Sequence, residues 1–366
     1  MAYTTIDDPS LYFQIALYTG NGNTGKNIPL SSANFTGEYV GQDIQPDWIW
    51  IKQRGATTDH GMFDSSRGVT KNLKTNAGEA ESTEAQSVTG FGSNDFTLGS
   101  SGDYNGADDE HVAWIWKANA GTETTNQSES GSQIACSVQA NTTAKFSIIT
   151  YTGTGGNGHT FLHGLGSTPK VIIIKLRTGA DRGWIFYHHK AHATPQENLL
   201  LLNTTAAVAD LNRLDDTAPN STEIAVSDDT HVNADSKTYV SYAFDEVQGY
   251  SKFGSYKGNG NADGPFVYLG FKPAFVIIKS STKDSQSWHM LTGIIATGKN
   301  SNPLTDALDA NQNIAERGTF TTDFLSNGFK IRHVSGGTGT SGETYIYMAF
   351  AESPFVSSEG VPTTAR

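Results

Sequence analysis

The stretch Pro46-Asp-Trp-Ile-Trp-Ile-Lys52 decides the fold, because the chain repeats it twice more in nearly the same form. The second copy reads Pro169-Lys-Val-Ile-Ile-Ile-Lys175 and the third reads Pro273-Ala-Phe-Val-Ile-Ile-Lys279. Each run is apolar at nearly every position between its proline and its lysine, which is typical of a strand packed on both faces. A proline at the first residue of a strand fits this interpretation, because the missing N–H costs little there.

Two further landmarks flank each central run. A turn of the form Tyr-x-Gly-x-Gly precedes it, and a segment rich in aromatic residues closes the copy. The turns are Tyr18-Thr-Gly-Asn-Gly22, Tyr151-Thr-Gly-Thr-Gly155 and Tyr256-Lys-Gly-Asn-Gly260, and the closing segments are His111-Val-Ala-Trp-Ile-Trp-Lys117, Tyr239-Val-Ser-Tyr-Ala-Phe-Asp245 and Tyr345-Ile-Tyr-Met-Ala-Phe-Ala351. The proline and the closing segment are 65, 70 and 72 residues apart in the three copies. This near-constant spacing predicts one folding unit used three times.

The composition indicates the class of that unit. The 366 residues include 39 glycines, and short apolar runs between Gly, Pro, Asn and Asp are typical of strands joined by tight turns. We therefore predict an all-β protein with three tandem antiparallel β-sandwich domains of jelly-roll or lectin-like form. The predicted units are 1–120, 141–247 and 248–356, with a linker at 121–140 and a tail at 357–366. The first unit is a candidate anchor.

Charge and hydropathy exclude several classes of protein. The formal net charge is −12, whereas nucleic-acid binding usually needs a basic surface that displaces counterions from phosphate. No apolar stretch approaches the length of a transmembrane helix, so we expect no membrane insertion. The polar, acidic start of the chain is unlike a secretory signal and favours synthesis in a cytoplasm. A single cysteine, Cys136, excludes an internal disulfide.

Three stretches of the sequence resemble a family of bacteriophage virion proteins common in marine phages. They are Ala2-Tyr-Thr-Thr-Ile-Asp-Asp-Pro-Ser10 with the turn that follows it, Asp64-Ser-Ser-Arg-Gly-Val-Thr-Lys71 through Leu73-Lys-Thr-Asn76, and Gly249 to Phe266 together with the closing segment up to Phe355. The resemblance covers essentially the whole chain. It implies a virion structural, tail-fibre-like or lectin-like protein on the surface of a phage particle, and it brings no set of catalytic residues.

No catalytic, cofactor or metal site is predicted from the titratable residues. His188, His189 and His192 have a spacing that could bind a metal, with His159 and His163 nearby, but the other two copies have no equivalent cluster. The acidic groups Asp108-Asp-Glu110, Asp215-Asp216 and Asp228-Asp229 lie near Asn and Gly, where turn formation is their expected role. A calcium site in these loops stays open as an alternative. The glycine turns lack the Lys-Ser/Thr of a phosphate loop.

The aromatic residues offer the one candidate binding site. Trp48, Trp50, Trp114 and Trp116 alternate in pairs on two predicted strands of the first unit, so both members of each pair share a face. That face is either a core or an exposed platform on which a sugar stacks, and the core is the favoured interpretation. The four tryptophans are therefore the candidate glycan-binding residues.

These observations lead to three hypotheses about function. The favoured one is a non-enzymatic phage structural protein on the particle surface, as a tail-fibre, tail-associated or head-decoration component. It would contact other virion proteins and host surface glycans, and form a homo-oligomer, with a trimer favoured. The second is a carbohydrate-binding adhesin. The third is a polysaccharide depolymerase, which needs two opposed carboxylates in a cleft, and no sequence feature points to that pair.

Overall fold

The computed structural model describes residues 3–30, 43–293 and 302–363. Strands account for 43% of the chain and helices for 3%, and the sheets are antiparallel. The all-β prediction is therefore confirmed. The finer prediction of three tandem sandwich domains stays a prediction.

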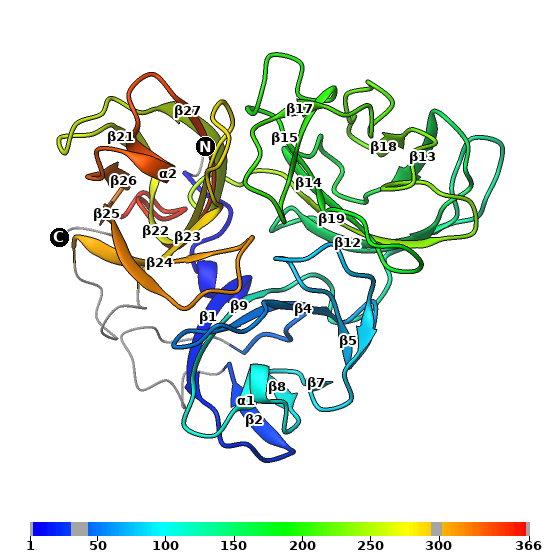
Figure 1. The fold of residues 1–366 in the computed structure, drawn as a ribbon, viewed down its shortest axis with the longest axis horizontal. Helices are drawn as coiled ribbons and strands as arrows, with labels where there is room; N and C mark the ends of the chain where they lie inside the picture. Colours follow the sequence, from blue (N-terminus) through cyan, green and yellow to red (C-terminus); the bar gives the residue numbers. More distant parts are fainter. Residues whose placement is uncertain (1–2, 31–42, 294–301, 364–366) are drawn as a thin grey trace.

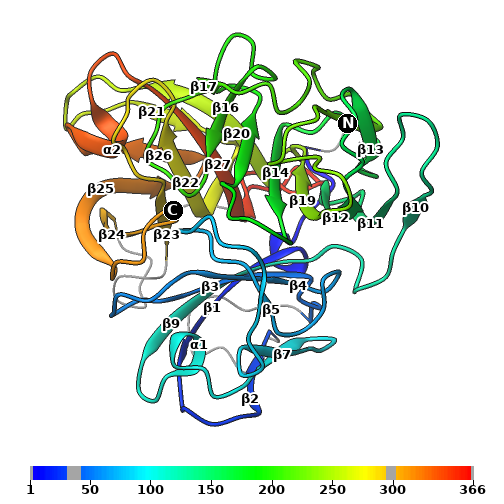
Figure 2. The same ribbon diagram turned by 45° about the vertical axis from the view of Figure 1, so that its right-hand side comes forward.

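The strands form three lobes, which surround a common centre (Figure 1). The first lobe, in blue and cyan, lies below the second and third lobes in both Figure 1 and Figure 2. The chain passes through the lobes in order, so each copy of the sequence repeat falls in one lobe.

The first lobe contains a four-stranded sheet in the order β1-β9-β3-β4, a three-stranded sheet β2-β8-β7 and the pair β5-β6. The 3-10 helix η1 (Pro9–Leu11) leads into it, and a short helix, α1 (Gly102–Asn105), precedes its last strand. Its strands are β1 (Phe13–Thr19), β2 (Lys26–Pro29), β3 (Trp48–Gln53), β4 (Gly61–Asp64), β5 (Lys71–Asn72), β6 (Ser82–Thr83), β7 (Val88–Phe91), β8 (Asp95–Leu98) and β9 (Glu110–Trp116).

The second lobe contains an eight-stranded sheet in the order β10-β11-β12-β19-β14-β15-β16-β17 and the pair β13-β18. Its strands are β10 (Thr125–Gln127), β11 (Cys136–Asn141), β12 (Phe146–Thr152), β13 (His159–Leu162), β14 (Val171–Leu176), β15 (Ile185–His188), β16 (Asn198–Leu201), β17 (Ala209–Asp210), β18 (Glu223–Val226) and β19 (Thr238–Phe244).

The third lobe is one eight-stranded sheet in the order β20-β27-β22-β23-β24-β25-β26-β21. A short helix, α2 (Gly336–Gly339), precedes its last strand. Its strands are β20 (Ser251–Lys257), β21 (Phe266–Tyr268), β22 (Phe271–Ser280), β23 (His289–Thr292), β24 (Leu304–Asp309), β25 (Arg317–Leu325), β26 (Gly328–Ile331) and β27 (Thr344–Pro354).

The three sequence copies have the same strand order. In each lobe the strand before the Tyr-x-Gly turn pairs with the closing strand, which pairs with the Pro-to-Lys strand, which pairs with the next strand along the chain. This order is β1-β9-β3-β4 in the first lobe, β12-β19-β14-β15 in the second and β20-β27-β22-β23 in the third. The predicted internal repetition is present in the structure.

The Tyr-x-Gly turn also forms the same contacts in every copy. The tyrosine hydroxyl donates to a backbone carbonyl: Tyr18 to Tyr104 at 2.8 Å, Tyr151 to Val232 at 2.6 Å and Tyr256 to Thr338 at 2.8 Å. The final glycine of each turn has a φ near +68°, a left-handed conformation in which glycine alone is unstrained. The tyrosine thus fixes the turn against the loop before the closing strand.

Each lobe has a core of its own, and a further core lies between them. The second, third and first lobes each bury one separate cluster of aliphatic and aromatic side chains. The largest cluster, called here the central cluster, takes buried residues from all three lobes. In β14, for example, Ile172 and Ile174 lie in the core of the lobe, whereas Val171 and Ile173 lie in the central cluster. The Pro-to-Lys strands are apolar on both faces because each face packs against a different core.

The stretch 121–140 differs from the linker that its composition suggests. β10 and most of β11 lie within it and pair with each other, and β11 pairs with β12 along its whole length. Cys136 is buried in the core of the second lobe. Polar Ser, Thr, Asn and Gln residues resemble linker composition, but they also suit a strand with one solvent-facing side.

Candidate functional site

The four tryptophans proposed as a sugar platform lie in the interior. Trp48, Trp50, Trp114 and Trp116 are 0–3% exposed and belong to the central cluster. Trp48 contacts Trp116 at 4.4 Å and Tyr242 of the second lobe at 4.7 Å between ring centroids. No ring face is open to a sugar, so the glycan-binding assignment of these residues is corrected. Of the two interpretations left open by the sequence, the core interpretation agrees with the structure.

The lobes are joined in a ring by one hydrogen bond that recurs three times. Trp184 Nε1 of the second lobe donates to Lys74 O of the first at 2.9 Å, and Trp288 Nε1 of the third donates to Leu201 O of the second at 3.1 Å. At the equivalent position of the first lobe, His60 Nε2 lies 3.1 Å from Asp309 O of the third.

His60 makes this contact as a donor. Its Nδ1 accepts a hydrogen bond from Trp50 Nε1 at 2.9 Å, so Nε2 carries the proton and donates to Asp309 O, as the two indoles do. Burial lowers the pKa of His60 to about 3, and the ring is therefore neutral at pH 7. The three donors form a closed cycle in which the first lobe contacts the third, the third contacts the second and the second contacts the first.

A backbone hydrogen bond repeats around the same ring. Glu81 N donates to Arg177 O at 2.9 Å, Val208 N to Ser281 O at 3.0 Å and Glu316 N to Arg54 O at 2.7 Å. Two of the three junctions add an ion pair at these positions. They are Arg177 with Glu81 at 2.9 Å and Arg54 with Glu316 at 2.8 Å.

The lysine that ends each central run is fully buried. Lys52, Lys175 and Lys279 are each 0% exposed, and burial lowers the pKa of each ammonium to about 8. Two of them donate to a carbonyl of the preceding lobe: Lys175 Nζ to Gly78 O at 3.0 Å and Lys279 Nζ to Thr205 O at 3.3 Å. Buried lysines with low pKa values occur at catalytic sites, but Lys175 and Lys279 are held by backbone carbonyls at the junctions.

Lys52 differs from the other two lysines, and the loop that follows its strand is one residue shorter than theirs. It donates to Ala56 O at 3.0 Å and to Thr58 Oγ1 at 3.2 Å within its own lobe. The buried lysine of the first lobe therefore stabilises a loop rather than a junction.

A buried ionic network joins the first and second lobes. Arg67, whose side chain is 0% exposed, pairs with Asp64 at 2.5 Å and with Glu81 at 3.0 Å. Tyr242 of the second lobe donates to Asp64 Oδ2 at 2.7 Å. Although burial favours its neutral form, the guanidiniums of Arg177 and Arg67 hold the pKa of Glu81 below its usual value.

The histidines considered for metal binding make contacts between lobes. His188 accepts from Lys190 N through Nδ1 at 3.1 Å, so its Nε2 donates to Tyr347 O of the third lobe, also at 3.1 Å. His189 Nε2 lies 2.7 Å from Phe253 O of the third lobe. Within the described part of the chain, no group of three His, Cys, Asp or Glu residues is placed to hold a metal ion.

The remaining histidines lie apart from this pair. His192 contacts Thr194 in an exposed turn. His159 contacts Thr154, and His163 contacts Asn220, both within the second lobe. The spacing in the sequence therefore does not bring the five rings to one site.

One His–Asp pair has the hydrogen-bond geometry of a proton relay, but its imidazole has no side open to a substrate. His289 Nδ1 lies 2.7 Å from Asp309 Oδ1, and Arg317 pairs with the other oxygen. A Cβ added to Gly337 would lie 1.6 Å from His289 Nε2, so the backbone of Gly337 closes the far side of the ring. The Phe320 ring covers the imidazole with a centroid separation of 4.0 Å. The pair thus serves packing in the third lobe.

Most residues of the acidic groups lie in turns or loops, as their composition predicts, but Glu110 begins strand β9. Asp108, Asp215 and Asp216 have φ values between +48° and +64°, a conformation that Asp tolerates better than most residues. Asp229 pairs with Arg213 at 2.8 Å and its Oδ1 lies 2.8 Å from His231 Nδ1.

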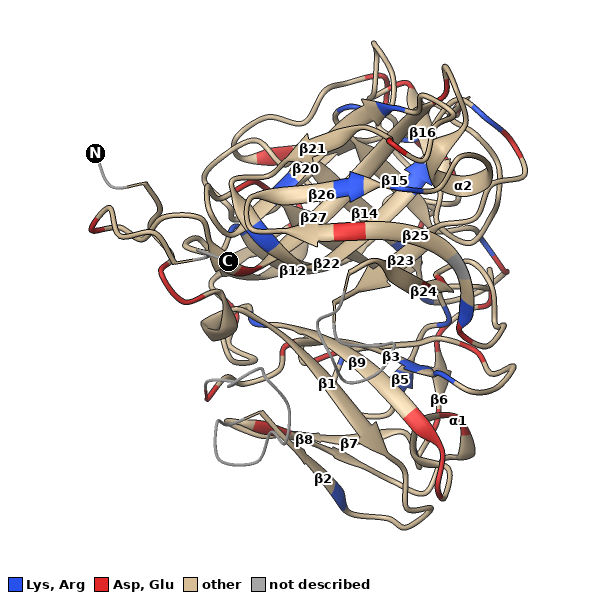
Figure 3. Ribbon diagram, turned by 90° about the vertical axis from the view of Figure 1, so that its left-hand side faces the viewer, with Lys and Arg blue, Asp and Glu red and all other residues tan. Residues whose placement is uncertain are grey.

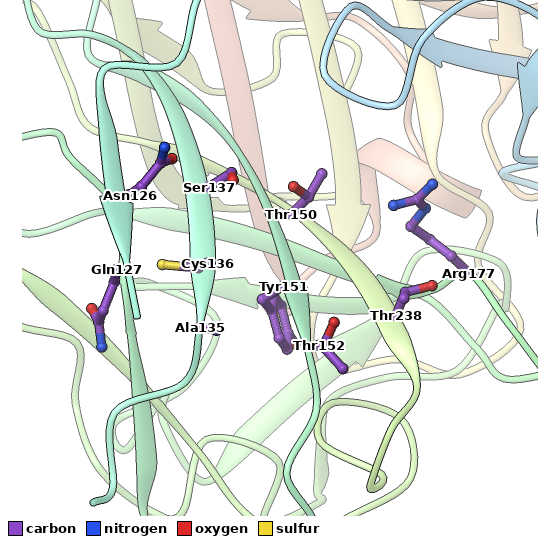
Figure 4. Close-up of a pocket in the computed structure, with 10 residues that line it drawn as sticks. All are labelled: Asn126, Gln127, Ala135, Cys136, Ser137, Thr150, Tyr151, Thr152, Arg177 and Thr238. Carbon is purple, nitrogen blue, oxygen red and sulfur yellow. The ribbon is translucent and has the colours of Figure 1, made fainter. Parts of the chain in front are cut away.

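The candidate site is a solvent-facing hollow of about 380 Å³ on the second lobe (Figure 4). We call it the hydroxyl hollow. Its lining residues come from β10, β11, β12 and β19, from the residue before β11 and from the residue after β14; they are Asn126, Gln127, Ala135, Cys136, Ser137, Thr150, Tyr151, Thr152, Arg177 and Thr238.

The strand register decides which side chains of the hollow share a face. Ser137 is opposite both Asn126 and Thr150, and Thr152 is opposite Thr238. Directly opposite residues lie on the same side of a sheet, so these five side chains share one face. On β12 this is the face through which Phe146 and Ile148 pack into the central cluster, and it opens to solvent at Thr150 and Thr152. Cys136 and Tyr151 alternate with them and point into the core of the lobe.

The hollow carries almost no net charge. Arg177 is the one cation among its lining residues, and both Nε and Nη2 are bound to Glu81, at 2.9 and 3.1 Å. Burial raises the pKa of the Cys136 thiol, which keeps it protonated and a weak nucleophile. The arrangement offers hydroxyl and amide groups for binding and no acid, base or nucleophile for chemistry.

Sequence reasoning did not find this hollow. Two of its strands fall in the stretch interpreted as a linker, and its threonines come from β12 and β19, whose aromatic and apolar residues dominate the pattern. The alternation Ser147, Ile149, Tyr151 against Ile148, Thr150, Thr152 shows a strand with two different faces, but it does not tell which face meets solvent.

A model of a protein family described as "Domain of unknown function (DUF7483)" matches residues 8–354. No curated protein and no solved structure matches the chain. Of the helices in the described residues, none is long and apolar enough to cross a membrane. The match spans nearly the whole chain, including all three lobes, and the chain therefore belongs to this family.

Proposed function

Because membership of this family brings no assigned activity, the function has to come from the chain itself, and we propose a non-enzymatic structural protein on the surface of a phage particle. The setting comes from the resemblance of its sequence to marine phage virion proteins. In this role it is a tail-fibre, tail-associated or head-decoration component that binds other virion proteins and meets the host surface.

One observation supports a structural role most directly. The groups that elsewhere perform chemistry are used here to hold the lobes together: Lys175 and Lys279 bind carbonyls of a neighbouring lobe, and His60 and His188 do the same. A protein that places its buried titratable groups between repeated units gains a fixed shape. A fixed shape is what a particle component requires.

The surface charge is consistent with this role. Lys and Arg are dispersed among Asp and Glu over the strands and loops (Figure 3), and the net charge is −12. In the part of the chain that this view describes, no single basic stripe marks a nucleic-acid partner.

The internal ring bears on the predicted oligomer. Three copies in one chain already close a cycle of contacts, as a cyclic trimer of separate chains does. The trimer of chains predicted from the sequence would contain nine copies of the repeated unit, three from each chain. Light scattering on the purified 39.2 kDa chain measures this directly.

The experiment that tests the proposed function is detection of the chain in intact particles. Particles from an infected culture of a host whose phage encodes the chain are purified by density gradient and labelled with gold-conjugated antibody against the purified protein. Label at one fixed place on the particle is the expected result. A chain found in the infected cells and absent from purified particles would overturn the proposal.

A second function, carbohydrate binding, is favoured by one observation: the hydroxyl hollow presents Ser, Thr and Asn groups to solvent. An adhesin and a particle-surface protein are compatible, because host attachment is carried out by surface components.

A further inference from the structure

We propose that the hydroxyl hollow binds an uncharged glycan through Asn126, Ser137, Thr150 and Thr152. This inference rests on the proposed function for its biological setting, and it goes further by naming the site and the chemical class of the ligand. It depends on the size of the hollow, its unused hydrogen-bonding groups and its charge.

The hollow is large enough for a sugar. Its volume of about 380 Å³ lies in the range of roughly 300–1,000 Å³ that is usual for small-molecule sites. Asn126 and Thr152 are exposed, while Ser137 and Thr150 are half-buried, so the polar groups form both the rim and the floor.

These polar groups are free to bind a ligand. Among the residues that the structure describes, the side chains of Asn126, Ser137, Thr150 and Thr152 form no hydrogen bond with another protein group. Each hydroxyl supplies one donor and two acceptor lone pairs, and the amide supplies two donors and an acceptor. A ligand that is both donor and acceptor at many positions fits such a surface, and a sugar is that kind of ligand.

The charge of the site separates a neutral sugar from an anion. A phosphate, sulfate or sialic acid site usually presents an unpaired Arg or Lys. Arg177 is held on two sides by Glu81, so its charge is compensated before a ligand arrives. The site therefore favours uncharged hydroxylated ligands.

The hollow belongs to the second lobe alone, within the described residues. β10 and β11 extend its sheet beyond β12, whereas the corresponding strands β1 and β20 are the ends of their sheets. Without those two strands one wall of the hollow is missing. The first lobe nevertheless keeps a matched threonine, because Thr19 lies at the position equivalent to Thr152 and is also exposed.

The test is binding of the purified full-length chain to an array of neutral, sialylated and sulfated glycans, followed by calorimetry with the strongest neutral binder. Three variants are compared with the natural chain: Thr150→Val with Thr152→Val, Ser137→Ala, and the control Thr19→Val. Valine keeps the shape of threonine and replaces the hydroxyl with a methyl group, and circular dichroism with thermal unfolding confirms that each variant is folded.

The expected result is binding to neutral glycans that changes little between low and high salt. The double variant should weaken it at least about tenfold, as the loss of one or two hydrogen bonds predicts, Ser137→Ala should weaken it severalfold, and Thr19→Val should leave it unchanged. Three results would overturn the inference: no neutral glycan bound at millimolar concentration, preference for anionic glycans that salt abolishes, or binding that the folded double variant retains.

Failure here is distinguishable from failure of the proposed function. A chain found on the particle that binds no glycan removes the inference and leaves the structural role. A chain that binds neutral glycans and is absent from particles removes the structural role and leaves the site.

Discussion

The junction between the first and second lobes differs from the junction between the second and third, although both use the same backbone geometry. Glu81 and Arg177 form an ion pair at the first junction, and Val208 and Ser281 occupy the equivalent positions at the second. The hydrogen bond between the two backbones has nearly the same length in both, 2.9 and 3.0 Å. The repeated architecture is therefore carried by the backbone bond and the shared core, and the ion pairs are local additions.

The junction between the first and third lobes shows how such an addition depends on its surroundings. Glu81 is bound by two guanidiniums and its pKa is lowered, whereas burial raises the pKa of Glu316, whose ion-pair partner is Arg54. At equivalent positions of the repeat, the surroundings thus stabilise the ionised form of Glu81 and destabilise the ionised form of Glu316. Two features account for the difference: Arg67 supplies a second guanidinium at Glu81, and the nearby carboxylates of Asp306 and Glu110 add to the burial that raises the pKa of Glu316.

Among the variants that test this comparison, Arg67→Ala should cause the largest loss in the free energy of unfolding. In Arg67→Ala the buried carboxylates of Asp64 and Glu81 lose a partner whose side chain is 0% exposed. Breaking a buried pair from one side typically costs about 3–5 kcal/mol. We expect a loss of that size in the free energy of unfolding, measured by urea denaturation.

The control for Arg67→Ala is Arg332→Ala. Arg332 also pairs with an aspartate, Asp323, whose side chain is 11% exposed, but the side chain of Arg332 is 41% exposed. Water can therefore reach this pair, and solvent-accessible pairs contribute about 0–1 kcal/mol. Equal losses in the two variants would contradict the conclusion that Arg67 belongs to a buried ionic network that joins the first and second lobes.

The pH dependence of stability should be the next largest effect. Folding lowers the pKa of His60 and His188 to about 3, so below pH about 6.5 the unfolded chain binds protons that the folded chain does not. Stability therefore falls as the pH drops from about 6.5 towards 3. For each histidine, the free energy of unfolding falls by up to about 1.4 kcal/mol per pH unit across this window.

On the alkaline side, stability also rises with increasing pH, up to about pH 10. Folding lowers the pKa of Lys52, Lys175 and Lys279 to about 8, so between pH 8 and about 10.4 the unfolded chain again binds more protons, and stability rises with pH. Above about pH 10 the tyrosines reverse the slope, because burial raises the pKa of Tyr187 and Tyr239 to about 12. Urea midpoints measured from acid to alkaline pH should show a maximum near pH about 9–10.

Lysine variants sharpen this prediction. Lys175→Met should flatten the rise above pH 8 and also loosen the junction with Gly78, whereas Lys52→Met should flatten the rise without that loss, because its contacts lie within its own lobe. A rise that is unchanged in both variants would show that other groups cause it.

A smaller and more uniform effect is expected from a hydrogen bond that recurs in the three lobes. Asn76, Asn203 and Asn311 each accept a hydrogen bond through Oδ1 from the backbone N of His60, Trp184 and Trp288, and all three distances are 2.9 Å. Replacement by alanine leaves a backbone N–H without its partner, which costs about 1–3 kcal/mol. We expect similar losses in Asn76→Ala, Asn203→Ala and Asn311→Ala by thermal or urea unfolding, and a loss confined to one lobe would contradict their equivalence.

The sequence predicts the repeat, the strand class and the central strands well, since these depend on apolar runs and turn residues at fixed spacing. For Trp48 and the other three tryptophans the sequence leaves two possibilities, a core and an exposed platform. The alternation of the tryptophans along each strand shows that they share a face, but it does not show what covers that face. The covering residues, such as Tyr242 and Phe244, come from another lobe. The cycle of junctions cannot be predicted from the sequence, because its hydrogen bonds join residues of different lobes that lie far apart in the chain.

The sites illustrate the same limit. The histidines that cluster in sequence around residue 188 reach toward carbonyls of the third lobe, and long-range contacts of this kind leave no local pattern. The hydroxyl hollow depends on β10 and β11 pairing beside β12, and its strand residues have the composition of a linker. Charge, spacing and turn chemistry therefore predict the frame, whereas the use of each polar side chain depends on which strand lies beside it.

The smallest expected effect comes from adding the missing ion pair to the second junction, in the double variant Val208→Glu with Ser281→Arg. Val208 is half-buried but Ser281 is 0% exposed, so the arginine has to displace its surroundings, and Val208→Glu loses an apolar contact with the central cluster. Both single variants should therefore be destabilised, and the quantity that reports on the ion pair is its coupling energy. We expect a favourable coupling energy of a few tenths of a kcal/mol, within the range of about 0–1 kcal/mol usual for ion pairs near a surface, in a double-mutant cycle with both single variants. A coupling energy of several kcal/mol would show that the ion pairs, rather than the backbone bond and the core, define the junctions. A coupling energy near zero would show that the geometry of the first junction depends on Arg67 as well as on the pair itself.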